Sequence, residues 1–394
     1  MEQAAATTEM HCPICKKPEL IDFFQAKEIP AQDGVVWPSR EAAINAPSGD
    51  VDLVYCQKCA YIFNRSYDPR KISFLDYDFS LHYSGTYQQF NQMLINGLIN
   101  RHQLNNKTIL EVACGKGHFL VALCEAGDNR GIGIDPSFEK VDDLEYDSMQ
   151  ITYINDYYSA AYSDVKVDFI VCRHLIDELE RPVDFLKLMK QNLKQNPRSA
   201  IYLEIPNALK TFSSSLIWNI GYAKRSWFSP YSITYLLQLA GYKNIRIEEF
   251  LDGDYLGIEA FPAFSAEPTG EIKIEKIFQQ FETFSHAYRS GTIEWQQKLD
   301  AWNEKKFKLA LWGAGMRGIN FLSHFPNLSN LALVIDINPL RQGKFLPKSG
   351  FQVSAPEALK EQKVDIILIS NATYQNEIMA QAKALGFTGH FDIF

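Results

Sequence analysis

The stretch Thr108-Ile-Leu-Glu-Val-Ala-Cys-Gly-Lys-Gly-His118 carries the strongest structural signal in this chain. Its first five residues, Thr108–Val112, are apolar or β-branched apart from one acid, as in a buried strand. Gly115 and Gly117 follow at once, and residues 118–124 have apolar side chains at helical spacing. Glycines in such a turn let backbone N–H groups approach a ligand, and a helix start offers unpaired donors. The stretch therefore predicts a strand, a tight turn and a helix that form a ligand site.

An acidic residue follows this turn at a meaningful distance. A second strand, residues 131–135, ends in Asp135, and an acid about 20 residues past a glycine turn can bind the two hydroxyls of a ribose. Two features distinguish the turn from a dinucleotide site: Leu120 replaces the third glycine of G-x-G-x-x-G, and Glu111 lies within the first strand. A carboxylate beside the turn suits a cationic ligand. The alternative is a strand, turn and helix whose glycines serve packing alone.

Length and charge limit the class of protein. A chain of 394 residues suggests two or three domains. The net charge of −8 and a pI of about 5.6 argue against a nucleic-acid surface, which is normally basic. No apolar stretch approaches membrane-spanning length, and the N-terminal residues lack the features of a signal peptide. We therefore expect a cytoplasmic protein with no membrane or nucleic-acid partner, either a monomer or a homodimer.

The cysteines favour a metal site near the N-terminus. Cys12 and Cys15 form one C-x-x-C pair, and Cys56 and Cys59 form another. Four thiolates from two such turns make a tetrahedral zinc site with no open position, which indicates a structural role. The residues between the pairs predict a long loop that the metal ties down. The alternative is four unconnected buried thiols.

From residue 108 onward, strands and helices alternate. The predicted strands are residues 108–112, 131–135, 168–172 and 200–205, followed by 244–250 and 255–261 as a hairpin at one edge. A helix over about 88–101 precedes them. This pattern is typical of an α/β fold with a parallel sheet, which binds ligands at the carboxyl ends of its strands. The polar residues at those ends include Asn155, Asp156, Arg173 and His174. A histidine in such a place is either a helix-start hydrogen-bonder or a base.

A second glycine turn lies near the C-terminus. After a charged helix over residues 271–305, the strand 308–312 leads into Gly313-Ala-Gly-Met-Arg-Gly318, a full G-x-G-x-x-G. Asp336 ends the next strand, 331–335, and Asn371 follows the later strand 364–370. This arrangement predicts either NAD binding or a small half-sheet used for packing or substrate contact. The predicted domains are 1–75 (zinc-binding), 76–265 (core), 266–305 (helical connector) and 306–394 (C-terminal).

The first glycine turn resembles the first motif of the class I S-adenosylmethionine-dependent methyltransferases, Glu-x-(Gly/Ala)-(Cys/Ser)-Gly-x-Gly. The resemblance implies a Rossmann-like methyltransferase core that binds S-adenosylmethionine, with Asp156 near the adenine amino group. It implies cofactor contacts by residues at the strand ends of this core: Glu111, Ala113, Gly115, Gly117, Asp135, Pro136, Asn155, Asp156 and Arg173.

The order of cysteine pairs, methyltransferase core and small Rossmann-like C-terminal domain is similar to the sugar C-methyltransferases, over nearly the whole chain. Tyr83-Ser-Gly resembles the family's Tyr-Ser-Ser, whose tyrosine lines the active site. Residues 312–318 resemble its Tyr-Gly-Ala-x-x-Lys-Gly, with Arg317 replacing the lysine, and residues 336–347 resemble its Asp-x-Asn-Pro-x-Lys-x-Gly-x-x-x-Pro. The resemblance implies a nucleotide-linked deoxysugar as the acceptor. We expect Arg317, at a helix start, and Asn371 to contact it.

One departure concerns the expected base. The family's Tyr-x-Glu-His tetrad aligns with Gly221-Tyr-Ala-Lys224, so its glutamate and histidine are absent. Methylation of a carbon next to a ketone requires a base to remove a carbon-bound proton. The candidate catalytic residues are therefore Tyr83, Tyr222, Lys224 and His174. Alternatives are an N- or O-methyltransferase of a natural-product pathway, an NAD-dependent oxidoreductase that uses residues 313–318, and an inactive binding protein.

Overall fold

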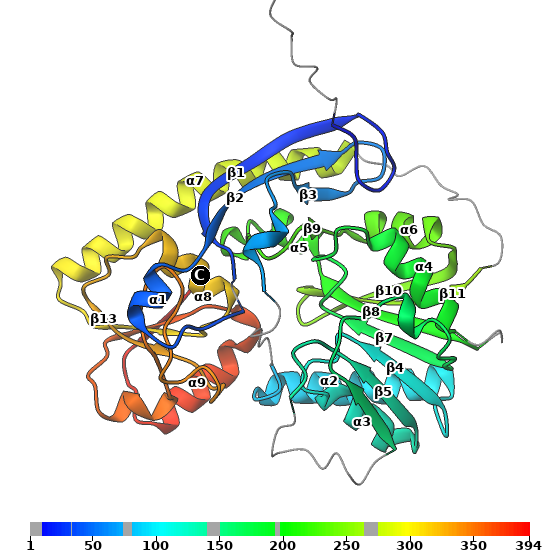
Figure 1. The fold of residues 1–394 in the computed structure, drawn as a ribbon. Coiled ribbons are helices and arrows are strands. Elements are labelled where there is room, and N and C mark those ends of the chain that lie inside the picture. Colours follow the sequence, from blue (N-terminus) through cyan, green and yellow to red (C-terminus); the bar gives the residue numbers. More distant parts are fainter. Residues whose placement is uncertain (1–9, 33, 74–80, 140–149, 194–197, 264–274) are drawn as a thin grey trace, which may run out of the picture.

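The structure is a computed structural model that describes residues 10–32, 34–73, 81–139, 150–193, 198–263 and 275–394. Three sheets organise these residues. In Figure 1 the central sheet and its helices form one lobe and the C-terminal sheet another, with the N-terminal strands and the long helix α7 running across both. No helix in the described ranges is long and apolar enough to cross a membrane.

The central sheet has the order β10-β11-β8-β7-β4-β5-β6. Its five strands from β8 to β6 are parallel, whereas β11 is antiparallel to both β8 and β10. Helices cover both faces of a parallel sheet, so the side chains of its inner strands are buried on both sides. This explains why the inner strands have near-continuous apolar sequences. The strands are β4 (Thr108–Val112), β5 (Arg130–Ile134), β6 (Ile151–Ile154), β7 (Phe169–Arg173), β8 (Ala200–Pro206), β10 (Tyr242–Phe250) and β11 (Tyr255–Pro262).

This architecture confirms the predicted α/β class with a parallel sheet and an edge hairpin. The chain leaves β4 for β5 on one side and returns to β7 on the other, so β4 lies at the switch point where such sheets bind ligands. Asn155 and Asp156, which the sequence placed at the end of a strand, directly follow β6. The helices are α2 (Gly85–His102), α3 (His118–Gly127), α4 (Pro182–Asn192), α5 (Ala208–Ser213) and α6 (Pro230–Leu239), with 3-10 turns η3 (Ala160–Tyr162) and η4 (Ile217–Asn219).

The N-terminal sheet has the order β1-β2-β3-β9. The prediction of a long loop between the cysteine pairs is wrong, because β1 (Leu20–Pro30) and β2 (Ser48–Cys56) pair as antiparallel strands over most of that segment. Alternating buried and exposed residues along β1 are consistent with this pairing. The remaining elements are α1 (Arg40–Ile44), β3 (Ile62–Asn64), η1 (Pro69–Lys71) and β9 (Ser226–Trp227), the last contributed from within the predicted core range.

The C-terminal sheet is entirely parallel, with the order β14-β13-β12-β15-β16. The predicted strands 308–312, 331–335 and 364–370 correspond to β12, β13 and β15, whereas β14 and β16 were not predicted. The elements are β12 (Leu309–Trp312), α8 (Met316–His324), β13 (Leu331–Ile335), β14 (Val353–Ser354), η5 (Pro356–Lys360), β15 (Ile366–Ile369), η6 (Ala372–Tyr374), α9 (Gln375–Ala384) and β16 (His390–Ile393).

The predicted helical connector corresponds to α7 (Glu275–Glu304). Its buried Phe281 and Phe284 pack on aromatic side chains of β1 and α5, which joins the connector to the N-terminal sheet. The first residues of the predicted helix, 271–274, and the domain boundaries at 75/76 and 265/266 lie outside the described residues. The division into four domains stays a prediction.

Candidate cofactor and acceptor sites

The first glycine turn leaves β4 at the switch point of the central sheet. Ala113, Gly115 and Gly117 all have positive φ angles, 60°, 54° and 86°, so the backbone turns sharply over a few residues. A Cβ atom at Gly117 would lie 2.5 Å from the Tyr153 hydroxyl, which only glycine avoids. A Cβ at Gly115 would meet nothing within 4 Å, so this part of the turn borders open space that a ligand can enter.

The Asp135 carboxylate fixes the turn to the end of the neighbouring strand. Its Oδ2 accepts a hydrogen bond from the backbone N–H of Gly115 at 2.9 Å. Its Oδ1 accepts from the backbone N–H and from the hydroxyl of Ser137, both at 2.7 Å. Pro136 lies between these two residues in the bend after β5. The turn and the acid, both predicted at strand ends, thus lie in contact, and the ribose role of Asp135 stays a prediction.

Glu111 is a buried acid beside the turn, and one of its carboxylate oxygens accepts no hydrogen bond within the described ranges. The side chain is 3% exposed, and its Oε2 has no hydrogen-bond partner among the described residues. Burial raises the pKa of Glu111 to about 8, although the positive charge of Arg173 opposes the shift. A buried carboxylate oxygen without a hydrogen bond costs free energy, which a cation beside it would offset. The residues thus fit S-adenosylmethionine, whose ammonium and sulfonium are positive.

The other predicted cofactor residues differ in position. Asn155 and Asp156 are exposed at the end of β6, where Asn155 donates to the Phe138 carbonyl at 2.8 Å and Asp156 accepts from the Tyr162 hydroxyl. Arg173 is buried and does not donate to the glycine turn. Its guanidinium contacts residues beside β7: Glu204 at 2.9 Å, the hydroxyl of Tyr87, Asn91 at 3.1 Å and the ring face of Phe119.

A cavity of about 230 Å³ lies between the central sheet and the C-terminal sheet. Its lining includes five of the predicted residues, Tyr83, His174, Lys224, Arg317 and Asn371. Parallel pairing places Val112 beside Cys172, so the glycine turn after β4 and His174 after β7 emerge at the same edge of the sheet. A group bound in the cavity would therefore lie next to a cofactor bound at the glycine turn.

Tyr222 is the predicted catalytic residue that the structure places elsewhere. Its ring is fully buried against Gly49 and stacks on Tyr67 at 5.5 Å. Its hydroxyl accepts a hydrogen bond from the backbone N–H of Asp68 at 2.7 Å, and it does not line the cavity. The expectation that Tyr222 acts on the acceptor is therefore not supported, because packing directs its hydroxyl into the N-terminal sheet region.

His174 and Glu204 form a hydrogen-bonded pair at the cavity. The Nε2 atom of His174 lies 2.9 Å from Oε1 of Glu204, whose side chain is fully buried. Arg173 contacts the same oxygen, and the Tyr202 hydroxyl donates to Oε2 at 3.0 Å. Glu204 was not predicted as a site residue. The isolated acid in the apolar run Ala-Ile-Tyr-Leu-Glu-Ile-Pro was the signal that could have revealed it.

Asp177 is a second buried acid that lines the cavity and was not predicted. It is 4% exposed, and its Oδ1 has no hydrogen-bond partner among the described residues. Burial raises the pKa of Asp177, while the charges of Lys224 and His174 lower it. Lys224, a predicted catalytic residue, thus contributes positive charge next to Asp177.

Arg317 connects the two sheets across the cavity. One of its guanidinium nitrogens contacts Oδ2 of Asp254 at 2.9 Å, and another donates to the Asn219 side chain. Asp254 lies in the turn between β10 and β11 and also accepts from the Thr373 hydroxyl at 3.2 Å. Asn371 lines the cavity while its side chain caps η6 by accepting from the Thr373 N–H at 3.0 Å. The predicted acceptor contacts of Arg317 and Asn371 stay predictions.

The second glycine turn faces the same cavity. Asp336 accepts a hydrogen bond from the N–H of Ala314 at 2.8 Å, as Asp135 does from the first turn. Arg341, which is buried, donates to the Ala314 carbonyl at 2.6 Å. A Cβ at Gly315 would meet nothing within 4 Å. The turn is therefore held from both sides and is open on the cavity side.

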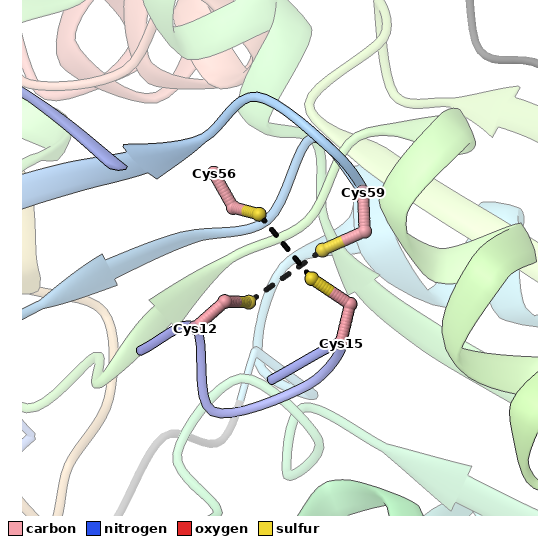
Figure 2. Close-up of side chains that lie close together, drawn as sticks. All are labelled: Cys12, Cys15, Cys56 and Cys59. Atoms are coloured by element: carbon pink, nitrogen blue, oxygen red, sulfur yellow. Dashed lines mark hydrogen bonds between the residues drawn. The ribbon is translucent and has the colours of Figure 1, made fainter. Parts of the chain in front are cut away.

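The four cysteines of the two C-x-x-C pairs come together at the end of β2, as Figure 2 shows. Their Sγ atoms all lie within 4.8 Å of one another, and the Cys12–Cys59 and Cys15–Cys56 separations are 3.6 Å and 3.5 Å. Zinc–sulfur bonds of about 2.3 Å in a tetrahedron require sulfur separations of about 3.8 Å. The cluster is therefore compatible with zinc.

Two family models match this chain in adjacent segments. Residues 86–247 match the model of a methyltransferase domain, which spans the helix before β4 and most of the central sheet. Residues 264–391 match the model of a C-methyltransferase C-terminal domain, which includes α7 and the second glycine turn. Curated protein sequences give no significant match.

Two of the solved structures that resemble this chain each cover less than half of it. One is the PH0226 protein from Pyrococcus horikoshii OT3, at 13% identity and a TM-score of 0.37 over 47% of this chain and 96% of that one. Another is magnesium protoporphyrin IX methyltransferase from Synechocystis PCC 6803 with bound SAH, at 15% identity and a TM-score of 0.36 over 45% of this chain and 84% of that one.

Proposed function

We propose that this S-adenosylmethionine-dependent methyltransferase transfers the methyl group to a carbon atom of a nucleotide-linked keto-deoxysugar or a closely related small metabolite. The observation that carries the proposal is the cavity at the end of the glycine-turn sheet, which the second glycine turn closes from the other side. A nucleotide-linked acceptor has an anionic part and a sugar part. One wall of the cavity suits the anionic part, and the opposite wall suits the sugar.

The methyl donor would be held by the first glycine turn. Glu111 supplies the negative charge next to the donor's cationic groups, the Asp135 carboxylate lies at the expected ribose position, and Gly115 leaves room for close approach. The donor provides a methyl group on a positively charged sulfur. The chain's contribution is to hold donor and acceptor in line, which alone accounts for a large part of the acceleration of group transfer.

The acceptor would lie between the sheets. Arg317 and the N–H groups of the second glycine turn suit an anionic phosphate, because helix starts and arginines are the usual phosphate ligands. Tyr83, His174 and Tyr255 line the opposite wall and suit a sugar ring. The match of residues 264–391 to a C-methyltransferase C-terminal domain supports a carbon acceptor over a hydroxyl or amine.

A panel of acceptors tests the proposal. The full-length protein, incubated with isotopically labelled S-adenosylmethionine, is offered nucleoside-diphosphate-linked keto-deoxyhexoses, the matching sugars without a ketone, and simple amines and alcohols. We expect label in a new carbon–carbon bond of the keto-deoxyhexoses alone. Label transferred to oxygen or nitrogen would contradict the carbon acceptor, and label in non-nucleotide compounds alone would contradict the nucleotide-linked class.

We also propose that zinc occupies the four-cysteine cluster and stabilises the N-terminal sheet. Four thiolates leave no coordination position for water, so the metal would have no part in methyl transfer. Cys56 ends β2 and Cys12 precedes β1, so the cluster ties the ends of this strand pair together. Elemental analysis of the purified protein should give one zinc ion per chain.

A further inference from the structure

His174 is held in an unusual backbone conformation beside the cavity. Its φ angle of 55° is in the left-handed region, which disfavours residues other than glycine because the Cβ atom crowds the backbone. Two bonds to the same residue hold it there: its backbone N–H donates to the Glu204 carbonyl at 2.8 Å, and its Nε2 lies 2.9 Å from the Glu204 carboxylate. Strained residues of this kind concentrate at functional sites.

The Glu204 carboxylate determines which ring nitrogen of His174 carries a proton. Burial alone would raise the pKa of Glu204, but the charge of Arg173 and the hydrogen bond from His174 outweigh it and lower the pKa to about 2. An ionised carboxylate only accepts hydrogen bonds, so Nε2 of the neutral imidazole carries the hydrogen. Nδ1 then has a free lone pair, and no described residue contacts it by a hydrogen bond. The His174 side chain is 29% exposed and lines the cavity.

We propose that His174 is the general base of the reaction and that Glu204 is its positioning residue, a pair that takes the place of the absent Glu-His at residues 223–224. This inference rests on the proposed carbon acceptor, because a carbon next to a ketone must lose a proton before it can accept the methyl group. The buried Arg173, which contacts the same carboxylate oxygen, in turn keeps Glu204 ionised.

The step balances without a further reactant. Nδ1 of His174 takes the proton from the carbon next to the acceptor's carbonyl, and the electron pair of that C–H bond moves toward the carbonyl oxygen. The same carbon then forms a bond to the methyl group, and the electrons of the breaking sulfur–carbon bond stay on sulfur. The resulting imidazolium is stabilised by the adjacent Glu204 carboxylate and releases its proton to solvent.

The principal rival for this role is Asp177. It lines the same cavity and has an unpartnered carboxylate oxygen. However, it is 4% exposed, so a proton taken up there would have no direct route to water. The His174 side chain is more exposed than Asp177, and the Glu204 carboxylate holds its ring in place. The histidine is therefore the better candidate, and the experiment includes both residues.

Hydrogen exchange in the acceptor tests the base separately from methyl transfer. A nucleoside-diphosphate-linked keto-deoxyhexose is incubated in D₂O with the protein in the absence of methyl donor, and mass spectrometry follows deuterium at the carbon next to the ketone. We expect exchange with the wild type and at least a 100-fold slower exchange with His174→Asn, since general bases contribute about 10²–10⁴-fold. Calorimetric binding of the same sugar should change by less than about threefold.

A second histidine–glutamate pair supplies the matched control. His102 contacts Glu259 near the end of α2, and neither residue lines the cavity. His102→Asn therefore disturbs a second buried histidine–glutamate pair, away from the cavity, and should leave exchange at the wild-type rate. The tautomer is read separately in the wild type by ¹⁵N NMR, because Glu204→Gln would strip the buried Arg173 of its counter-charge and risk misfolding. A hydrogen on Nδ1 of His174 would overturn the proposal.

The possible results distinguish an error in the assigned base from an error in the proposed acceptor class. Normal exchange with His174→Asn would overturn the base while leaving the carbon acceptor in place, and loss of exchange with Asp177→Asn alone would assign the role to Asp177. If the wild type methylates oxygen or nitrogen and exchanges no carbon-bound hydrogen, the proposed acceptor is wrong and the role of His174 is wrong with it.

Discussion

The carboxylate of Glu377, on α9 of the C-terminal sheet, accepts a hydrogen bond from the hydroxyl of Ser84, the N-cap residue of α2, at 2.7 Å. The same carboxylate accepts from the backbone N–H groups of Gly85 and Thr86, both at 3.1 Å. A residue from one sheet thus caps a helix that packs on the other, directly after Tyr83. Because both Glu377 and Tyr83 line the cavity, the capping contact sets the distance between its two walls.

We expect Glu377→Ala to loosen the cavity. The substitution removes the three hydrogen bonds to α2, a fourth from the Gln381 amide, and a negative charge at a helix start, a loss of about 1–2 kcal/mol in unfolding free energy. The acceptor's KM should rise at least fivefold, whereas the dissociation constant of S-adenosylmethionine should change little. Glu357→Ala, at an exposed glutamate of η5, is the control. An unchanged KM would show that the capping contact has no part in forming the acceptor site.

Arg317→Ala should weaken acceptor binding by removing a direct contact, whereas Glu377→Ala changes the shape of the cavity. Arg317 is the guanidinium that lines the cavity from the start of α8, although it is paired with Asp254 in this structure. We expect a rise of at least tenfold in the acceptor's KM, because a charge-assisted phosphate contact contributes about 1.5–3 kcal/mol. Steady-state kinetics with saturating methyl donor measures the effect, with Arg246→Ala on the exposed face of β10 as control. Equal KM values for both variants would refute the contact.

Removing a cysteine should release the metal. Cys12→Ser leaves three thiolates, so we expect loss of bound zinc and a fall in melting temperature, since structural zinc contributes directly to folding. Cys124→Ala is the control: it also alters a buried cysteine but lies in α3, away from the cluster. Elemental analysis with thermal unfolding of each variant provides the measurement. Zinc retained at the wild-type level in Cys12→Ser would contradict the four-cysteine site.

Glu111 should make the ligand-free protein less stable as the pH rises. Its pKa in the folded state is raised from 4.5 to about 8, so its favourable contribution is complete below pH 4.5 and is lost as the pH rises toward and through 8. Glu111→Gln removes this loss. The variant's melting temperature should exceed that of the wild type by on the order of 5 °C at pH 8, and the difference should shrink toward pH 5. A constant difference across this range would show that Glu111 does not titrate in the folded protein.

Local sequence patterns were sufficient for the strands of the central sheet and for the first glycine turn. Strand, turn and acid lie within residues 108–135, so the contact between Gly115 and Asp135 follows from adjacent strands alone. The His174–Glu204 pair depends on the register of β7 with β8, which no local pattern specifies. The ion pair of Arg317 with Asp254 depends on how two separate sheets pack. The burial of Tyr222 depends on a close approach to Gly49 in another sheet.

The segment between the two cysteine pairs also could not be predicted from local sequence alone. Its glycines and prolines favoured a loop, but the alternating pattern of β1 is stabilised by pairing with β2 and by aromatic packing on α7, far along the chain. Tertiary contacts of this kind outweigh local propensity in strands. The cysteine spacing, in contrast, predicted the cluster because four ligands at matched spacing have one compact arrangement.

Calorimetric titration of the wild type and of Glu111→Gln with S-adenosylmethionine tests the central claim, that the carboxylate beside the first glycine turn binds the cationic donor. We expect the wild type to bind with proton release near pH 7, because the donor's positive charge favours ionised Glu111, and the variant to bind at least tenfold more weakly without that release. Equal affinity and equal proton release in the two proteins would contradict the account.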